Sequence, residues 1–304
     1  MGKKGDDVMV SKILVIGSAN ADLVIHSDKM PKLGETLTGS NFQVNAGGKG
    51  LNQAVAVSKL GGEVSFFGAL GNDANGEMLI KELTDNNVIF KGIKVADTPT
   101  GIAMITVVNG DNFIILDPGA NDCLTPKKLD EKLIAESDFC VMQLEIPLET
   151  VIRVCEIAKE NNTKVVLNPA PFRKLPQKLL ENIDYLIPNE HEAYDITGIS
   201  PDTPENCEKV ILKIREMGVK NVIVTLGERG CAYNVGERIA FCPAIKTKVV
   251  DTTSAGDCFI GALVSRLSKG VSLEDAINFA TKASAIAVSR AGASRSIPYE
   301  TEIR

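Results

Sequence analysis

Short apolar runs alternate with amphipathic stretches along most of this chain, and this alternation constrains its fold more than any other feature. Five such runs occupy residues 13–16, 64–67, 139–142, 164–167 and 222–226. Each is followed by glycine or by polar residues, and stretches with helical spacing such as 148–159 and 204–217 lie between them. Buried strands that alternate with helices are typical of a parallel sheet covered on both faces. The sequence therefore predicts a three-layer α/β/α fold with a mainly parallel central sheet.

Two segments interrupt this alternation. Residues 23–45 and 93–116 contain no clear helical pattern and carry strand-prone residues, as in 36–38 and 102–107. Asn109-Gly110 separates two strand-like runs, and both residues tolerate the positive φ of a hairpin turn. We expect these segments to form a small β-sheet that projects from the main domain. An exposed apolar face on such a sheet would be covered by a substrate or by a second subunit.

Size and charge exclude several classes of protein. The chain has 304 residues, 44% of them hydrophobic, which is enough to bury a large core. Its formal net charge is −6 and its pI is about 5.2, whereas a nucleic-acid-binding protein usually carries a basic face. No apolar run approaches the length of a membrane span. We expect neither a nucleic acid nor a membrane as a partner.

The cysteine pattern and the amino terminus indicate a cytoplasmic protein. No two cysteines have C-x-x-C spacing and only two histidines are present, so a structural zinc site is not expected. An odd number of cysteines in a long chain favours free thiols in a reducing compartment. Residues 1–11 lack an apolar signal core and are expected to be a disordered leader. The seven cysteines are Cys123, Cys140, Cys155, Cys207, Cys231, Cys242 and Cys258.

A glycine-rich segment, residues 45–54, leads into a helix that ends at Gly61. Glycines at a helix start let a ligand approach backbone N–H groups that the helix dipole makes attractive to electronegative atoms. The segment is not a Walker A loop, because no Ser or Thr follows Lys49, and it does not fit G-x-G-x-x-G. A simple glycine turn before a core helix is the alternative. The polar side chains of Lys49, Asn52 and Gln53 favour a surface that binds hydroxyl groups.

A second motif places an acid at the start of a helix. Residues 247–250 resemble a strand, and the loop from Asp251 then delivers Ala255, Gly256 and Asp257 to a helix N-terminus. Exposed N–H groups there can hold an anion that develops in a transition state, and Asp257 can accept a proton from an attacking hydroxyl. Phosphoryl transfer needs these parts, a metal and good alignment. An ordinary Asp stabilised by the helix dipole is the alternative.

Taken together, the two motifs resemble a known family. Residues 45–53 and 251–261 are similar to the paired signatures of the ribokinase (pfkB) family of carbohydrate kinases, and the likeness covers essentially the whole chain after the leader. Within the family, residues 47–53 look like the ribokinase branch, since fructokinases and nucleoside kinases differ there. Residues 18–22 and 167–171 are similar to that branch too.

The resemblance implies a fold, a reaction and an assembly. A single ribokinase-like α/β domain over 12–304 would carry lid segments at approximately 22–46 and 93–117. It would phosphorylate D-ribose at the 5-hydroxyl with ATP, giving D-ribose 5-phosphate and ADP. Mg²⁺ would accompany the nucleotide, K⁺ would activate the enzyme, and the lid sheets of two subunits would join in a homodimer.

The resemblance also implies residue roles. Asp257 would be the general base, and Ala255 and Gly256 would belong to the anion hole. The sugar would contact Asn20, Asp22, Gly48, Lys49, Asn52, Glu145 and Asp257. The N-x-x-E motif, Asn189 and Glu192, would arrange phosphate and Mg²⁺. The nucleotide would also border Thr225, Leu226, Gly227, Glu228, Arg229, Gly230, Gly256 and Thr281. The monovalent cation would be held by Asp251, Thr253, Ala287, Arg290, Gly292 and Ser296.

Three positions depart from the family pattern, and three other functions stay open. Cys258 stands where Thr is common, Ser254 where a smaller residue is common, and Thr281 where His or Asn is usual. We expect Cys258 to be a packed small side chain. The alternatives are a kinase for another sugar or nucleoside, a non-catalytic sugar-binding regulator, and a dinucleotide-dependent oxidoreductase. The absence of G-x-G-x-x-G after residues 13–16 disfavours the last.

Overall fold

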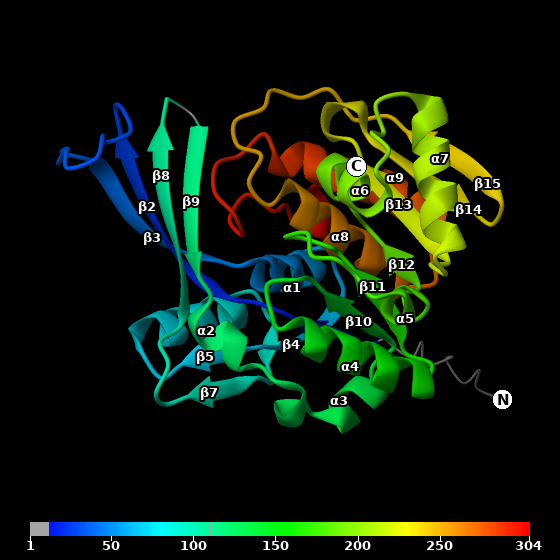
Figure 1. The fold of residues 1–304 in the computed structure, drawn as a ribbon, viewed down its shortest axis with the longest axis horizontal. Helices are drawn as coiled ribbons and strands as arrows, with labels where there is room; N and C mark the ends of the chain where they lie inside the picture. Colours follow the sequence, from blue (N-terminus) through cyan, green and yellow to red (C-terminus); the bar gives the residue numbers. More distant parts are fainter. Residues whose placement is uncertain (1–11, 110) are drawn as a thin grey trace, which may run out of the picture.

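The structure, a computed structural model, describes residues 12–109 and 111–304 and is shown in Figure 1. The expected leader over residues 1–11, and Gly110 of the expected turn, lie outside the described residues.

A nine-stranded sheet forms the centre of the main domain, in the order β15-β14-β13-β12-β11-β10-β1-β4-β6. Seven neighbouring strands, from β6 to β13, are parallel, and β14 and β15 are antiparallel at one edge. The mainly parallel sheet predicted from the sequence is therefore confirmed. The strands are β1 (Lys12–Ile16), β4 (Glu63–Phe67), β6 (Ile89–Phe90), β10 (Phe139–Met142), β11 (Lys164–Leu167), β12 (Tyr185–Leu186), β13 (Asn221–Thr225), β14 (Cys231–Val235) and β15 (Arg238–Cys242).

Helices cover both faces of this sheet, and the central strands alternate their side chains between two cores. Ile13 and Val15 of β1 pack in one core, while Leu14 and Ile16 pack in the other. The first core is completed by α1 (Lys49–Lys59), α2 (Ala74–Asp85), α8 (Ala255–Leu267) and α9 (Leu273–Ala287). The second is completed by α3 (Glu131–Ala135), α4 (Leu148–Glu160), α5 (Gln177–Leu180), α6 (Glu190–Thr197) and α7 (Pro204–Glu216).

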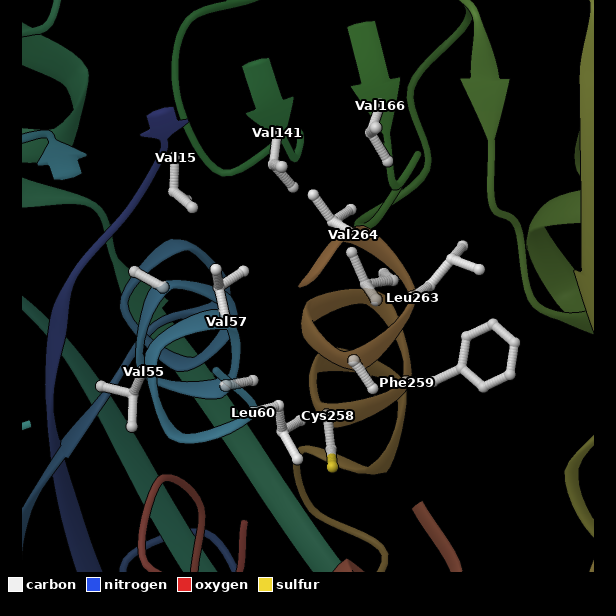
Figure 2. Packing of buried hydrophobic residues seen from close by; sticks show 14 of the residues in the cluster. Val15, Val55, Val57, Leu60, Val141, Val166, Cys258, Phe259, Leu263 and Val264 are labelled. Carbon is white, nitrogen blue, oxygen red and sulfur yellow. The ribbon is translucent and has the colours of Figure 1, made fainter. Parts of the chain in front are cut away.

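Helices α1 and α8 pack side by side against the middle of the sheet. Figure 2 shows Val57 and Val264 below Val15 and Val141, which project from β1 and β10. Gly261 makes this approach possible, because a Cβ there would lie 2.3 Å from Ala56 Cβ and 2.8 Å from the Val57 backbone nitrogen. The N-terminal turns of the two helices are thereby brought together.

A separate four-stranded sheet, which we call the projecting sheet, stands away from the body (Figure 1). Its order is β3-β2-β8-β9, with β2 and β8 parallel and the outer pairs antiparallel. Asn109, at the end of β8, has a φ of 52°, as the expected hairpin turn requires. The strands are β2 (Asn20–Ser27), β3 (Ser40–Gly47), β8 (Gly101–Val108) and β9 (Asp111–Asp117).

The register gives the projecting sheet two distinct faces. Leu23 pairs with Val44 and Met104, and Met104 pairs with Ile115, so these four side chains lie in one row on one face. Met104 is 55% exposed and Ile115 is 73% exposed. Asp22 is one residue from Leu23 and lies on the opposite face. The sheet thus carries an uncovered apolar row on the side away from Asp22.

The structure differs from the sequence-based expectation at three short segments. Residues 36–38 form no strand, because the chain before them turns at Glu35, whose carboxylate accepts the backbone N–H of Lys32 at 3.0 Å. Ile93–Val95 forms β7, but it pairs with β5 (Ala69–Gly71) in a two-stranded sheet of its own. Residues 247–250 form no strand either. Their strand-prone side chains find no neighbouring strand, and Val249 and Val250 are exposed.

Candidate active site

The polar residues singled out from the sequence meet beyond the carboxyl ends of β1, β10 and β11. This is the edge at which parallel α/β sheets place their ligands. Ser18 follows β1, Glu145 follows β10 and Asn168 follows β11, while the N-termini of α1 and α8 come from the helical layer. The projecting sheet begins at the same place, with Asn20 as the first residue of β2.

Glu145 joins two of these segments. Its Oε2 accepts a hydrogen bond from Ser18 Oγ at 2.5 Å and another from the backbone N–H of Lys49 at 3.1 Å. Lys49 is the first residue of α1, so the carboxylate also benefits from the positive end of the helix dipole. The acid is therefore fixed between the loop after β1 and the start of α1.

The glycines before and in α1 allow close packing of protein against protein. Gly48 has a φ of 90°, and a Cβ there would lie 2.8 Å from Ala19 Cα. A Cβ at Gly50 would lie 2.7 Å from the backbone nitrogen of Ser18. The sequence analysis expected a ligand to approach the backbone of this segment, and the structure shows in addition that the loop after β1 packs against these two glycines. The glycines thereby bring that loop to Lys49.

Asp22 lies on the face of the projecting sheet that turns toward this cluster. Burial, with a smaller contribution from the Glu145 carboxylate, raises its pKa from 3.8 to about 7. A built Cβ at Gly47 would fall 2.1 Å from Asp22 Oδ2, so glycine is what makes room for this carboxyl group.

Asn20 is held by a residue that the sequence analysis did not single out. Asn121 Nδ2 donates to Asn20 Oδ1 at 2.8 Å, and Asn121 Oδ1 accepts the Ala19 backbone N–H at 3.0 Å. Both asparagine side chains are buried. Asn121 follows the projecting sheet in a short 3₁₀ helix, Gly119–Cys123, and no motif marks it in the sequence. It fixes the amide of Asn20 through that residue's oxygen.

The raised pKa of Asp22 predicts a pH-dependent affinity for a polyol. A carboxylate that accepts hydroxyl hydrogen bonds must be ionised, so the fraction in the competent form falls as the pH drops below about 7. Because the family resemblance implies that Asp22 accepts a sugar hydroxyl, we expect the KM for that sugar to rise by roughly tenfold per pH unit below that value. Initial-rate measurements from pH 5.5 to 8.5 test this. The Asp22→Asn variant should bind more weakly but without the pH dependence. A KM that stays constant over this range in the unmodified protein would contradict the prediction.

Asp257 occupies the third position of α8, behind an uncapped N-terminus. The residue before the helix, Ser254, has a left-handed backbone with φ 61° and makes no side-chain capping bond. The backbone N–H of Ala255 donates to Thr252 O at 3.2 Å, so it is engaged within the loop. At Gly256, by contrast, a built Cβ would meet no atom within 4 Å. The space in front of α8 is open at Gly256.

Two amides of α1 hold the carboxylate of Asp257. Asn52 Nδ2 donates to Asp257 Oδ2 at 3.3 Å and to Ser254 Oγ at 3.0 Å. Gln53 Nε2 donates to Asp257 Oδ1 at 3.0 Å. The sequence analysis placed Gln53 in a polar surface but gave it no contact with the acid. Asp257 is only 7% exposed, and each of its oxygens has an amide partner.

Lys49 stands among the acids of this cluster. Burial lowers the pKa of its ammonium group, but the charges of Asp257, Glu145 and Glu192 outweigh burial and hold the pKa above 10.5. Lys49 is therefore cationic at any ordinary pH. The charge of Lys49 therefore interacts with Asp257 and Glu145, the two acids expected on the sugar side, and with Glu192 of the N-x-x-E motif.

The N-x-x-E motif forms the N-terminus of α6. Asn189 Oδ1 accepts the Glu192 backbone N–H at 2.9 Å, and Glu192 Oε2 accepts the Asn189 backbone N–H at 2.9 Å. An isolated bridge ties Asn189 to Thr225, which ends β13. Burial raises the pKa of Glu192.

The expected nucleotide loop, residues 225–230, is adjacent to this motif, since Arg229 is anchored to the same helix. Its guanidinium contacts Glu190 and donates to the carbonyl oxygens of Pro201 at 2.8 Å and Asp202 at 2.9 Å. Arg229 is thus held in the body of the protein. Leu226 is buried, Gly227 and Glu228 start the short 3₁₀ turn Gly227–Arg229, and Gly230 has a φ of 95°.

Thr281 lies on α9 and is 8% exposed. Its Oγ1 is 3.5 Å from Cys242 Sγ, at the end of β15. This contact places α9 beside the antiparallel hairpin that continues the nucleotide loop.

The expected monovalent-cation residues come from two segments that Asp251 joins. Asp251 Oδ1 accepts the Thr253 backbone N–H at 2.8 Å, and Oδ2 accepts the Gly292 backbone N–H at 3.0 Å. Burial raises the pKa of Asp251, but these hydrogen bonds outweigh it and leave the pKa below its usual value. Ala287, which ends α9, and Ser296 are buried.

The resemblance assigns the cation largely to backbone carbonyls of these residues, and two of their side chains are engaged elsewhere. The Arg290 side chain pairs with Glu302 at 2.6 Å, and Ser296 Oγ donates to Ala293 O at 2.9 Å. Within residues 12–109 and 111–304, no group of three or more His, Cys, Asp and Glu side chains is arranged to hold a metal ion.

The cysteines are free thiols, and Cys258 beside Asp257 is fully buried. Burial raises the pKa of the Cys258 thiol to about 12. It packs between α8 and Leu60 (Figure 2), which agrees with the expectation of a packed small side chain. Among the helices that the structure describes, none is long and apolar enough to cross a membrane.

Comparison with known proteins identifies relatives over almost the whole chain. The family model described as pfkB family carbohydrate kinase matches residues 10–300. A ribokinase of Lactococcus lactis is 40% identical over 298 residues, which is 97% of this chain and 96% of the relative. A deoxyribokinase of Salmonella typhimurium is 35% identical over 94% of this chain and 95% of its own. The structure of Arabidopsis thaliana ribokinase complexed with ribose and ATP superposes with a TM-score of 0.92, at 34% identity, over 97% of this chain and 98% of that one.

Proposed function

The chain belongs to the pfkB family of carbohydrate kinases, and from this premise we propose that it transfers the γ-phosphoryl group of ATP to the 5-hydroxyl of D-ribose. Support comes from the relative of Lactococcus lactis and from the Arabidopsis structure, which holds both ribose and ATP. The alternative within the family is another small sugar, as the deoxyribokinase illustrates. A non-catalytic sugar-binding regulator is a third candidate, although such a protein would need no base.

One observation carries the proposal. The carboxylate of Asp257 is held by two amides at the uncapped N-terminus of α8, beside open space at Gly256. In the proposed reaction Asp257 takes the proton of the attacking hydroxyl, and the first turn of α8 stabilises the negative charge that develops on the transferred group. The sugar would be bound by Asn20, Asp22, Gly48, Lys49, Asn52 and Glu145.

The nucleotide would lie between the N-x-x-E motif, residues 225–230 and Thr281. Mg²⁺ suits the amide and carboxylate oxygens of Asn189 and Glu192, and it would offset the charge of the phosphate groups. Because these oxygens already accept hydrogen bonds in the capping arrangement, the two residues would hold the ion through its water molecules.

The function is tested with a panel of sugars in a coupled assay for ADP. D-Ribose should give the highest kcat/KM, with 2-deoxy-D-ribose, D-fructose and adenosine as comparisons. A higher kcat/KM for one of these compounds would assign a different substrate of the same family to this chain. ATP-dependent turnover on none of them, with sugar binding retained in calorimetry, would favour the regulator.

A potassium dependence is expected from the loops joined by Asp251. Carbonyl oxygens and one carboxylate are the hard donors that an alkali cation accepts, and a cation there would fix the loop before α8. We expect activity to fall by about tenfold when K⁺ is replaced by Li⁺. Asp251→Asn should reduce the response to K⁺ more than it reduces the residual rate in Li⁺. Equal rates in the two salts would contradict this proposal.

The uncovered apolar row of the projecting sheet is proposed to be the dimer interface. Leu23, Val44, Met104 and Ile115 form a continuous strip of the kind that a second copy would cover. Ile115→Lys places a charge in that strip and is expected to raise the dimer dissociation constant at least 100-fold, as measured by sedimentation velocity. Lys94→Glu, on the two-stranded sheet, is the surface control and should leave the dimer intact. A monomer in the unmodified protein at micromolar concentration would rule out the interface.

A further inference from the structure

We propose that Gln53 and Gln143 form an amide relay that positions the carboxylate of Asp257, an inference that rests on the proposed role of Asp257 as the base. Gln53 lies on α1, and Gln143 is the first residue after β10. Both side chains are 0% exposed. They would be positioning residues, since neither one reaches the open space in front of α8.

The three side chains form an ordered chain of hydrogen bonds. Gln143 Nε2 donates to Gln53 Oε1 at 2.6 Å, and Gln53 Nε2 donates to Asp257 Oδ1 at 3.0 Å. Gln53 Nε2 also donates to Asn168 Oδ1 at 3.3 Å, and Asn168 Nδ2 donates to the Ile187 carbonyl oxygen at 3.1 Å. Each amide therefore has a defined orientation, set by residues beyond three different strands and one helix.

The direction of this chain follows from the charge of Asp257. An ionised carboxylate only accepts hydrogen bonds, so Gln53 must present its nitrogen to it. Its oxygen then faces Gln143, which must in turn present its own nitrogen. Rotating either amide would set two acceptors or two donors against each other.

Among the described residues, two amide oxygens on the side away from Asp257 have no hydrogen-bond partner, as expected if the amide nitrogens are directed toward the carboxylate. In the described part of the chain, Gln143 Oε1 and Asn52 Oδ1 are buried and have no hydrogen-bond partner. Both belong to amides whose nitrogens serve Asp257, Asn52 directly and Gln143 through Gln53. Buried carbonyl oxygens are normally paired, because an unpaired one costs free energy. The direction of the relay therefore leaves two buried carbonyl oxygens unpaired, on amides whose nitrogens serve Asp257.

The relay also connects the base to the sugar side of the site. Gln143 lies two residues before Glu145, so one short loop carries both the proposed sugar ligand and the first member of the relay. Gly17 keeps room for it, since a Cβ there would lie 2.0 Å from Gln143 Oε1. A shift of this loop would therefore change the position of Gln53, and with it the hydrogen bond to Asp257.

The side chains that hydrogen-bond to the Asp257 carboxylate are uncharged amides. Lys49 on α1 is the cation whose field reaches it, and the neighbouring Cys258 is a neutral thiol. The side chains that contact it from α1 are amides, as are the side chains behind them from the loops after β10 and β11. Removing a relay amide therefore changes hydrogen bonding to the carboxylate without changing the charge around it.

Gln53→Met and Gln143→Met remove the amides at nearly constant side-chain length. An amide donor stabilises the charged carboxylate over the neutral acid, so its loss should move the acidic limb of the kcat profile to higher pH. We expect a shift of about one to two pH units for Gln53→Met, the value of one hydrogen bond to a charged group. Gln143→Met should shift the limb in the same direction by less and lower kcat by roughly 2- to 10-fold. The KM values for sugar and ATP should change little.

Asn234→Leu is the matched control. Asn234 on β14 is also a buried amide, accepting from the Val222 N–H at 2.7 Å and donating to Lys220 O at 3.1 Å. It should lower the melting temperature and leave the pH profile in place. If both relay variants lose stability but keep the profile of the unmodified protein, the relay is wrong. Should Gln53→Met fail to fold, the profile of Gln143→Met decides.

The activity of Asp257→Asn distinguishes a failure of the relay from a failure of the proposed base. An inactive Asp257→Asn with unshifted relay variants would remove only the relay. An active Asp257→Asn would remove the proposed base itself, and the relay with it.

Discussion

Replacing Asp257 by Asn is expected to lower kcat by a factor of about 10² to 10⁴, the usual contribution of a general base. The dissociation constant for the sugar should change only a few-fold. The physical reason is that Asn cannot accept the hydroxyl proton, while the sugar keeps its other proposed ligands at Glu145, Lys49 and Asn20. Single-turnover kinetics with saturating ATP and calorimetry with the sugar alone give the two quantities separately.

The fold supplies a matched control for this substitution. Asp275 is the third residue of α9, just as Asp257 is the third residue of α8, and its backbone N–H donates to Ser272 Oγ at 3.2 Å. Both acids benefit from a helix dipole, and the Asp275 carboxylate also accepts a hydrogen bond from Ser272 Oγ at 2.7 Å, so Asp275→Asn measures what an acid at this helix position contributes to stability. It should cost some stability and no activity. Similar losses of kcat in the two variants would mean that Asp257 only stabilises its helix and is not the base.

The main domain was predictable because its signal is local. The runs 139–142 and 164–167 are strands with the predicted bounds, and residues 148–160 form the helix predicted over 148–159. Buried parallel strands are continuously apolar and end where the chain turns, so composition alone reveals them. The general location of the site followed from the same pattern, because ligands lie at the carboxyl ends of such strands.

What the sequence could not provide depends on long-range pairing. Residues 247–250 have strand-prone side chains but no partner strand, so propensity was misleading there. Gln143 and Asn121 carry no motif, and each matters only through a contact with a residue about 90 or 101 positions away. The close packing of the loop after β1 against Gly48 and Gly50 was not predicted either. A local sequence pattern does not show which distant residues will contact a given side chain.

Lys49→Met is expected to lower kcat/KM for the sugar by about 10² to 10³, the scale of one charged group that acts on the transition state. Lys49 is the cation among Asp257, Glu145 and Glu192, and its pKa is raised because those three charges outweigh burial. Without it, an acidic cluster would face the triphosphate of ATP, and like charges repel. Both ATP binding and the approach of the phosphoryl group should therefore suffer.

Two further variants identify charge as the cause. Lys49→Arg keeps the cation but changes its shape, so it should recover part of the lost activity. Lys81→Met removes an exposed lysine that pairs with Asp85 on α2, and it should have no effect on turnover. Removing the cation should also raise the pKa of Glu192, which the charge of Lys49 lowers, and Lys49→Arg should reverse that rise. A Lys49→Met enzyme with normal kcat/KM would mean that the three carboxylates are neutralised by another route, and that the charge of α1 plays no part in the transfer.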